Sequence, residues 1–471
     1  MKKTVIIGGG VAGLTAGIYC EKNGIDCEIL EKNTFCGGNL TGWNREGCYI
    51  DNCFHWLTGT LSGTELYRIW RDIGMITDRY SLYQPNVFYE SILNGESLAF
   101  SRYPEVTRLN MLRLSALDAD EIDRFIDAVE AVGEMMERKA PSPTVLAIYS
   151  RYRGISLLEL SEKFHHPLLK KAFTDYFGEY FSAIALIWAY GAFISGNGMI
   201  PRGGSKRAAE RIENKFISLG GKIRTDCAVE KLVVDGERAY GVITEKGEYI
   251  RANAIVCACD PAVTFGKLIS HSSMPKKFMS VYNNTEIAPR FSSVQAAFLC
   301  SSDAIPRFGT RVISCKLNGE IVRAVIKEYS YEPNFSPEGT VVVQAMIFTD
   351  SVRCERWINL RRDGERYKAE KQIYSETMMD AIVSLFPQVK DRIRCIDTWT
   401  PATYHRYFGS DHGAYMGFAL TPKTPLKRYS CRLKGLENVF MATQWQCSPG
   451  GLPNAARAGK KVAEEIRRIY K

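Results

Sequence analysis

The sequence lacks the cysteine and histidine spacings of metal sites and of disulfide scaffolds. Its 471 residues include 14 cysteines and six histidines, but no two cysteines form a Cys-x-x-Cys pair and no cluster has the spacing of a zinc site. No Ser-His-Asp arrangement can be placed. We therefore expect no metal. Because the first predicted strand begins at residue 4, we expect no secretory signal, and hence reduced thiols and a cytoplasmic location.

Long runs of charge or of apolar residues are also missing. The net charge is +9, but basic residues occur in scattered pairs such as Lys170-Lys171 and Arg467-Arg468, and no basic-aromatic motif indicates nucleic-acid binding. Such pairs are typical of a solvated surface; alternatively, they attract the protein to the inner face of a membrane as a peripheral contact. Residues 181–200 carry no charge but contain three glycines, which predicts a buried helix ending near Gly191 rather than a membrane span.

What the sequence does contain is a nucleotide-binding pattern at residues 4–31. An apolar, β-branched run at residues 4–7 is typical of a parallel strand buried on both faces. Three glycines follow in the pattern Gly-x-Gly-x-x-Gly and open a helix. The first glycine permits a tight turn, the second lets a phosphate approach the backbone, and the third lets the helix pack on the strand. The predicted nucleotide contacts are Gly8, Gly10, Val11, Ala12 and Gly13.

The carboxylate of Glu31 ends the second predicted strand, residues 27–30, eighteen positions after Gly13. At this spacing a carboxylate accepts hydrogen bonds from ribose hydroxyls and disfavours a 2′-phosphate, which argues against NADP. Strand, glycines, helix, strand and acid together predict a dinucleotide site that includes Glu31 and Lys32. They do not separate an NAD dehydrogenase from an FAD enzyme.

The residues after Glu31 separate these two classes. A second glycine pair, Gly37-Gly38, is followed by Asn39, and Asp51 stands in the stretch GCYIDNC. Here the sequence resembles the FAD-binding amine oxidase and phytoene desaturase superfamily, whose members carry such a doublet after the ribose acid. The resemblance implies that the cofactor is FAD and that Gly37, Gly38 and Asn39 help to hold it.

The resemblance extends over most of the chain. Residues 200–261 resemble the family's middle flavin segment, which implies a backbone contact from Val229 to the adenine. Residues 400–418 and 438–466 resemble the C-terminal signature of phytoene desaturase-like proteins, a branch that includes carotenoid isomerases and retinol saturases. The resemblance implies that a helix N-terminus points at the flavin ring. The segment that closes over the flavin is then Gly450, Gly451, Leu452 and Pro453.

Three positions depart from the family pattern. Asn39 replaces the arginine that usually follows the doublet, and Cys53 replaces a glycine. Residues 442–444, Ala-Thr-Gln, replace a glycine that an acid often follows. Each departure alters a contact near the flavin without removing the backbone cradle. Together they argue against a standard carotenoid desaturase and indicate a divergent branch.

The predicted fold class is α/β: a Rossmann-like FAD-binding domain of the glutathione reductase type, interrupted by a mixed α+β substrate domain. We expect the first insertion to be mostly helical, as a lid. Ser205 is expected to cap the helix that ends at Gly220-Gly221, and Asn318-Gly319 to turn a hairpin. The FAD-binding domain is predicted to comprise residues 1–70, 198–262 and 431–471, and the substrate-binding domain with its helical lid residues 71–197 and 263–430.

The chemistry expected of such a protein follows from its cofactor. A flavin performs the hydride step, and the protein supplies position, dryness and protons. We expect an oxidoreductase acting on C–C or C=C bonds of an apolar, unsaturated small molecule, by desaturation, saturation or isomerisation, in an apolar slot. No second Gly-x-Gly-x-x-Gly motif follows a predicted strand. An external electron donor or acceptor is therefore expected, unless the reaction is redox-neutral; the oligomeric state stays open.

The candidate proton donors are His55 and Tyr404. His55 follows the Asp51 stretch, which in the family passes close to the flavin ring, and a histidine titrates near neutrality, as protonation of a substrate carbon requires. Alternatively, His55 packs on the flavin and Tyr404 packs at a domain junction. Two other classes stay open: a flavin amine oxidase, and a non-catalytic prenyl-binding protein resembling the GDP-dissociation inhibitors, which the intact cradle and Glu31 disfavour.

Overall fold

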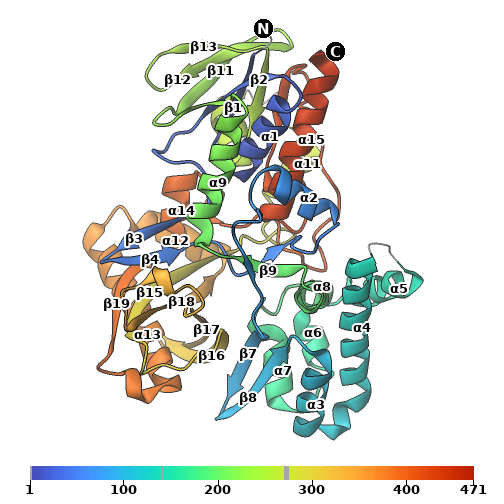
Figure 1. Ribbon diagram of the computed structural model, residues 1–471, viewed down its shortest axis with the longest axis vertical. Coiled ribbons are helices and arrows are strands. Elements are labelled where there is room, and N and C mark those ends of the chain that lie inside the picture. The colour runs from blue at the N-terminus through green and yellow to red at the C-terminus, as the bar shows by residue number, and fades with distance from the viewer. Residues whose placement is uncertain (1–2, 139–141, 270–274, 471) are drawn as a thin grey trace.

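The computed structural model describes residues 3–138, 142–269 and 275–470. Figure 1 shows an upper α/β unit that holds the elements nearest both ends of the chain. Below it lie a unit built on a large sheet and, beside that sheet, a helical unit. The chain passes between the units several times, so each is assembled from segments that are distant in sequence.

The upper unit is built around a five-stranded parallel sheet in the order β10-β2-β1-β14-β20. Helices α1, α9 and α15 pack on one face and a three-stranded antiparallel sheet packs on the other, which is why the strands are apolar on both faces. The elements are β1 (Lys3–Ile7), α1 (Val11–Glu21), β2 (Asp26–Leu30), α2 (Glu65–Asp72), α9 (Gly204–Ser218), β10 (Lys222–Arg224), β11 (Val229–Asp235), β12 (Arg238–Thr244), β13 (Tyr249–Arg251), β14 (Ala254–Cys257), β20 (Val439–Met441) and α15 (Leu452–Tyr470).

The large sheet has seven strands in the order β19-β15-β18-β17-β16-β7-β8. Arg311 of β16 pairs in parallel with Glu90 of β7, so residues of both insertions contribute to this one sheet. The turn at Asn318-Gly319 has the left-handed φ values, 51° and 87°, that the hairpin prediction requires. The strands are β7 (Val87–Leu93), β8 (Glu96–Ser101), β15 (Ser292–Ser301), β16 (Thr310–Leu317), β17 (Glu320–Glu328), β18 (Thr340–Thr349) and β19 (Ile393–Trp399), and the nearby helices are α12 (Ser351–Leu360), α13 (Gly364–Leu385) and α14 (Pro401–Phe408). Helix α11 (Lys276–Tyr282) instead packs in the core of the upper unit.

The first insertion contains more strand than the sequence analysis predicted. Its β7–β8 hairpin turns at Asn94-Gly95, with φ values of 52° and 85°, and packs on the helices that follow. The short strand β6 (Leu82–Tyr83) pairs with β9 (Gly198–Pro201). The helices are α3 (Pro104–Leu114), α4 (Ala119–Arg138), α5 (Pro143–Tyr152), α6 (Leu157–Ser161), α7 (Pro167–Asp175) and α8 (Ala183–Ile194).

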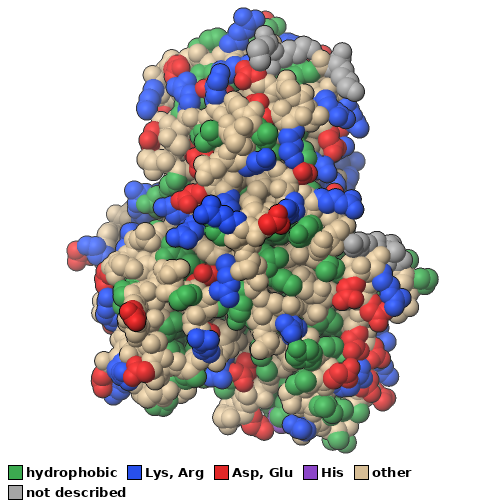
Figure 2. Space-filling view, viewed as in Figure 1, with side chains coloured by type: hydrophobic (Ala, Val, Ile, Leu, Met, Phe, Trp, Pro, Cys, Tyr) green, Lys and Arg blue, Asp and Glu red, His purple; other side chains and the backbone are tan. Residues whose placement is uncertain are grey.

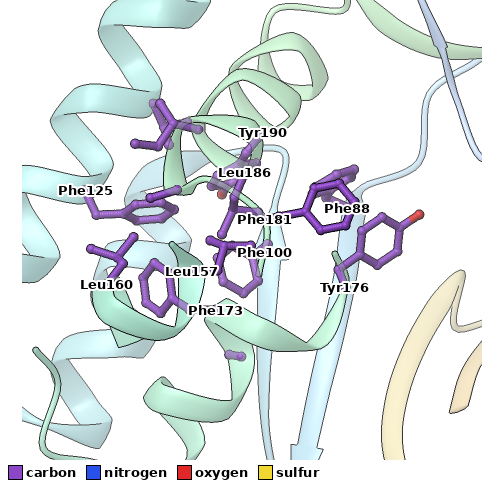
Figure 3. Close-up of a cluster of buried hydrophobic side chains, with 14 of the residues drawn as sticks. Phe88, Phe100, Phe125, Leu157, Leu160, Phe173, Tyr176, Phe181, Leu186 and Tyr190 are labelled. Atoms are coloured by element: carbon purple, nitrogen blue, oxygen red, sulfur yellow. The ribbon is translucent and has the colours of Figure 1, made fainter. Parts of the chain in front are cut away.

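Helix α8 continues past the glycine at which we expected it to end. A Cβ on Gly191 would lie 2.7 Å from Cγ1 of Val132, so this glycine allows α8 to cross closely over α4 instead of ending the helix. The apolar α8 belongs to an aromatic core, in which Figure 3 shows Phe100 and Tyr190 beside the side chains of neighbouring helices. Within the described ranges, no helix is long and apolar enough to cross a membrane.

The start of α9 differs from the prediction. The residue before the helix is Gly203, with φ +90°, and it makes no side-chain cap. Ser205 donates from both its backbone N and its Oγ to the carboxylate of Asp51, at 2.6 and 2.7 Å. The acceptor for the helix N-terminus therefore comes from a distant segment, a contact that local sequence does not reveal.

Charged side chains are interspersed on the visible surface. Figure 2 shows lysines, arginines and acids mixed over the upper unit, and acids gathered on the lower right, where α4 lies. Some of these acids pair with Arg108, whose guanidinium lies 2.5 Å from Asp123 and 2.7 Å from Asp127. The view is consistent with the solvated surface inferred from the scattered basic pairs.

Candidate active site

The glycine turn after β1 has the geometry of a phosphate cradle. A Cβ on Gly8 would lie 2.9 Å from the Ala258 carbonyl oxygen, and a Cβ on Gly13 would lie 2.0 Å from the Gly8 oxygen. A Cβ on Gly10 would meet no described atom within 4 Å. Gly10 therefore faces open space at the N-terminus of α1, where the described part of the chain provides no side-chain cap and backbone N–H groups are available to an anion.

The Glu31 carboxylate lies beside this turn. Its Oε2 accepts a hydrogen bond from the backbone N of Gly9 at 2.7 Å, and its Oε1 accepts one from the backbone N of Asn33 at 2.9 Å. The side chain is only 7% exposed. Two backbone donors thus fix the carboxylate at the edge of the cradle, at the end of β2.

Val229 and Lys32 differ in how close they lie to this edge. Cys227 donates its backbone N–H to the Glu31 carbonyl at 2.9 Å. Val229 begins β11 two residues later, so its backbone lies close to the Glu31 end of β2. The exposed Lys32 extends elsewhere, and its Nζ donates to the Arg406 carbonyl at 3.0 Å. Lys32 therefore connects β2 to α14 instead of turning toward the glycine loop.

The second glycine pair extends the cradle. Gly37 donates its backbone N–H to the Gly9 carbonyl at 2.8 Å. Gly38 has φ +59°, and a Cβ there would meet only the Cα of Gly10, at 3.4 Å. The two glycine segments, separated in sequence by α1 and β2, therefore lie side by side.

Asn39 connects the cradle to the C-terminal part of the chain. Its Nδ2 donates to the Tyr415 carbonyl at 2.9 Å, and its own carbonyl accepts from Asn52 Nδ2 at 3.0 Å. Its Oδ1 is buried and has no hydrogen-bond partner among the described residues. A buried acceptor without a donor is costly in a protein, so this oxygen indicates a position for a ligand donor.

The Asp51 carboxylate organises the segment that follows it. Besides accepting from Ser205, its Oδ1 accepts from the backbone N–H groups of Cys53 and Phe54, each at 3.0 Å. The carboxylate is 4% exposed. It joins the start of α9 to the turn at residues 51–54, and His55 directly follows this turn.

Gln444 occupies the place where the family often has an acid. Its Oε1 accepts from the backbone N of Gly451 at 2.8 Å and from that of Gly417 at 3.0 Å. A Cβ on Gly450 would lie 2.4 Å from the Cα of Gly417. The Gln444 amide oxygen therefore holds the Gly450-Gly451 turn next to the loop that contains Gly417. Leu452 and Pro453, which follow this turn, begin α15.

Two hollows meet at His55 and Lys327. The first hollow lies behind the Asp51 turn and is lined in part by Asn52, Cys53 and Gln344. The second is lined mainly by aromatic and aliphatic side chains. Both are lined by His55 and Lys327, so these two residues stand where the polar and the apolar spaces join.

His55 is not the near-neutral titrating group that we expected. Burial, together with the charge of Lys327, lowers its pKa to about 3, so the imidazole is neutral at physiological pH. Its Nδ1 is buried and has no partner in the described part of the chain. The ring is therefore poised to exchange hydrogen bonds with a bound molecule, but it does not carry a charge.

Lys327 is a candidate site residue that the sequence analysis did not name. It is 5% exposed, and its Nζ donates to the Phe54 carbonyl at 2.8 Å. Burial lowers its pKa from 10.5 to about 8, against the opposing effect of Asp51. The available signal was a lysine at the end of the apolar strand sequence EIVRAVIK, because burying a lysine costs free energy unless its charge is paired or hydrogen-bonded, and lysines with such perturbed pKa values occur often at functional sites.

The second hollow is apolar on most of its wall. Trp56 and Phe88 have ring centroids 5.4 Å apart, and Phe88 and Tyr176 lie 5.2 Å apart. Figure 3 shows Phe88 and Tyr176 at one side of the aromatic core, with the Tyr176 hydroxyl directed away from the cluster. The core of the helical unit thus supplies the wall that leads to His55 and Lys327.

The hydroxyl group of Tyr404 makes all the hydrogen bonds that it can. It accepts from Gln295 Nε2 at 2.8 Å and from Trp399 Nε1 at 2.9 Å, and it donates to Asn52 Oδ1 at 3.2 Å. Burial raises the pKa of this hydroxyl above its usual value. The geometry favours a structural role: Tyr404 holds Asn52, which in turn holds Asn39.

These features fit a dinucleotide that runs from the glycine turn to the hollows. Open space faces Gly10, a fixed carboxylate stands at the edge, and buried oxygens without partners among the described residues occur at Asn39 and at Gln344. The Gln344 oxygen and the Nδ1 of His55 belong to residues that line the first hollow. A flat ligand with N–H groups would satisfy them.

The comparisons with known proteins agree with this geometry. Residues 11–467 match the model of the family described as flavin containing amine oxidoreductase. The all-trans-retinol 13,14-reductase of Danio rerio is 22% identical, with 90% of this chain and 81% of that protein covered. The phytoene desaturase of Fusarium fujikuroi is 23% identical, with 99% and 89% covered.

A solved structure shares the fold. An oxidoreductase from Methanosarcina mazei has a TM-score of 0.65 and 16% sequence identity, with 98% of this chain and 100% of that chain covered. The curated relatives lie in the branch that the sequence resemblance identified. The chain therefore belongs to the flavin-containing amine oxidoreductase family, in its phytoene desaturase-like branch, and its cofactor is FAD.

Proposed function

We propose that this oxidoreductase acts on C–C or C=C bonds of an apolar, unsaturated molecule, by desaturation, saturation or isomerisation. The observation that carries the proposal is the second hollow, whose aromatic wall of Trp56, Phe88 and Tyr176 ends at His55 and Lys327. An apolar wall binds the apolar part of a substrate, and the few polar groups at the end of the hollow orient the substrate atoms that react. The relatives named as a retinol reductase and a phytoene desaturase support this class of substrate.

We propose that the cradle residues hold FAD, and that when bound it exchanges a hydride with a substrate carbon. The N–H groups at the start of α1 bind the pyrophosphate beside Gly10, and Glu31 accepts from the ribose. Asn39 offers its free Oδ1 to a donor of the ligand. The proposed set is Gly8, Gly10, Val11, Ala12, Gly13, Glu31, Lys32, Gly37, Gly38, Asn39, Val229, Gly450, Gly451, Leu452 and Pro453, of which Lys32 contributes through the α14 contact.

In this proposal Lys327 supplies or receives the proton. Its ammonium group has a pKa of about 8, close to the pH at which a general acid is most effective. His55, whose pKa is about 3, stays neutral and positions the reacting molecule through a hydrogen bond. The proton then passes directly between Nζ and the substrate.

Tyr404 acts as a positioning residue in this proposal. Its hydroxyl proton is already donated to Asn52, and two further donors occupy its oxygen. A hydroxyl in this state has no proton free for substrate. It keeps Asn52, and through it Asn39, at the inner edge of the cradle.

A flavin amine oxidase would present a different site. Its substrate is a small polar amine that is protonated in water, and the Lys327 ammonium would repel it at the end of the hollow. A prenyl-binding protein without flavin chemistry does not need the open space at Gly10 or the fixed Glu31 carboxylate. We further propose an external electron donor or acceptor, because the cradle accounts for a single dinucleotide.

The test follows the flavin absorbance of the holoprotein under anaerobic conditions. All-trans-retinol and carotenoid polyenes are mixed with the oxidised and with the dithionite-reduced protein. Bleaching indicates desaturation, reoxidation indicates saturation, and a change of polyene isomer without net flavin change indicates isomerisation. Lys327→Met should abolish the response, whereas Lys276→Met, on the exposed face of α11, should retain it. Bleaching by primary or secondary amines with no response to polyenes would refute the proposal.

A further inference from the structure

Two tyrosines from different insertions stack at the outer end of the second hollow. Tyr83 lies on β6, and Tyr331 follows β17. Their ring centroids are 4.3 Å apart and their planes differ by only 9°. Both rings line the hollow and both are partly exposed, as Trp56 is, whereas Phe88 and Tyr176 are buried. The stack is therefore one of the places where the lining of the hollow borders solvent.

The backbone on each side of the stack is held in place. Tyr83 pairs with Ile200 of β9, and the backbone N of Arg202 donates to the Ser81 carbonyl at 3.1 Å. The guanidinium of Arg202 lies over the Tyr83 ring, 5.2 Å from its centroid, and donates to the Tyr331 carbonyl. One arginine therefore contacts the backbone on one side of the stack and the ring on the other.

Tyr331 also contacts the residue that we propose as the proton donor. The Lys327 Nζ lies 5.0 Å from the ring centroid of Tyr329 and 5.7 Å from that of Tyr331. Two aromatic faces near an ammonium stabilise its charge. A rotation of the Tyr331 ring therefore removes one of these faces, so the stack connects the opening of the hollow to its reactive end.

We propose that Tyr83 and Tyr331 form a side-chain gate that admits flat, conjugated chains to the cavity in front of Lys327 and retards saturated chains. A ring that rotates out of a stack leaves a slot of the thickness of one aromatic ring. A planar polyene fills this slot and stacks on the remaining tyrosine, as aromatic surfaces prefer. A saturated chain has a thicker cross-section and gains no stacking. The inference rests on the proposed function and adds to it a step that discriminates between conjugated and saturated chains as they enter.

The test measures how fast two fatty acids with the same headgroup enter the FAD-loaded holoprotein. Trans-parinaric acid, a conjugated fluorescent tetraene, is followed by stopped-flow fluorescence. Stearic acid, the saturated acid of the same length, is measured by displacement. The wild type should admit the tetraene several-fold faster. Tyr83→Ala and Tyr331→Ala, which remove the stack, should raise the stearic acid rate about five-fold and erase the preference.

Three further variants control for non-specific effects. Tyr83→Phe keeps the stack and should behave as the wild type. Tyr83→Trp enlarges it and should slow both acids. Tyr240→Ala removes a ring that is 46% exposed on the remote sheet of the upper unit and should change nothing. Equal rates in the wild type, Tyr83→Ala and Tyr83→Trp would overturn the gate, even if both acids bind. Failure of every protein to bind either acid would instead contradict the proposed apolar substrate.

Discussion

Replacing the buried lysine Lys327 should stabilise the protein while removing its activity. The pKa of Lys327 falls from 10.5 to about 8 because folding buries the ammonium group. At pH 7 both the folded and the unfolded protein carry this charge, and the folded state bears the full cost, about 3 kcal/mol at 1.36 kcal/mol for each pKa unit. Lys327→Met removes the charge and retains the apolar stem.

Part of this gain is lost with the contacts of the ammonium group. The Phe54 carbonyl loses its donor, and Tyr329 and Tyr331 lose a cation, which together cost about 1 kcal/mol. We expect the variant to be more stable by about 2 kcal/mol at pH 7. Between pH 8 and 10.5 the folded lysine releases its proton before the unfolded one does, so the cost fades. By pH 9.5 the advantage should shrink to about 0.5 kcal/mol.

The measurement is urea unfolding of the holoprotein in excess FAD, followed by tryptophan fluorescence at pH 7 and at pH 9.5. Lys276→Met, an exposed lysine on α11, is the matched control and should show no difference between the two pH values. A Lys327→Met protein that is less stable than the wild type at pH 7 would refute the reasoning. So would an advantage that stays constant as the pH rises.

Two further predictions concern the cradle and Tyr404. Gly10→Ala places its Cβ in open space, so stability should change by less than about 1 kcal/mol while FAD affinity in a binding titration falls by more than about ten-fold. Gly13→Ala meets the Gly8 oxygen and should cost about 3 kcal/mol in thermal unfolding; equal effects of the two variants would contradict the assigned roles. Tyr404→Phe leaves the partners of its hydroxyl unpaired and should cost about 2 kcal/mol, with polyene turnover within about ten-fold of wild type; a hundred-fold loss would return Tyr404 to the catalytic set.

The β7–β8 hairpin shows where a local signal was present but outweighed. Asn94-Gly95 is as strong a turn signal as Asn318-Gly319, and both form left-handed turns. The first insertion was nevertheless expected to be helical because amphipathic helices dominate its later part. The pairing of β7 with β16, more than 200 residues away in sequence, completes the strand and cannot be inferred from either segment alone.

His55 and Ser205 show a different limit. The position of His55 after the Asp51 stretch was found from sequence, but its pKa depends on Lys327 and on burial, and both come from a distant strand. Ser205 was expected to act within its own helix, yet it binds Asp51 across the fold. In both cases the sequence drew attention to the residue, and a distant partner decided its charge or its contacts.

The sequence by itself determined the FAD family, and it predicted the glycine turn after β1 and the hairpin at Asn318-Gly319, because turns, glycine spacings and buried strands are encoded by neighbouring residues. Only the tertiary structure decided which side chains meet behind the cradle. The Lys327 ammonium and the Phe54 carbonyl are 273 residues apart in sequence, and the stacked Tyr83 and Tyr331 rings come from separate insertions. Packing brings such groups together, and burial then shifts their pKa values. A local sequence pattern cannot predict either effect.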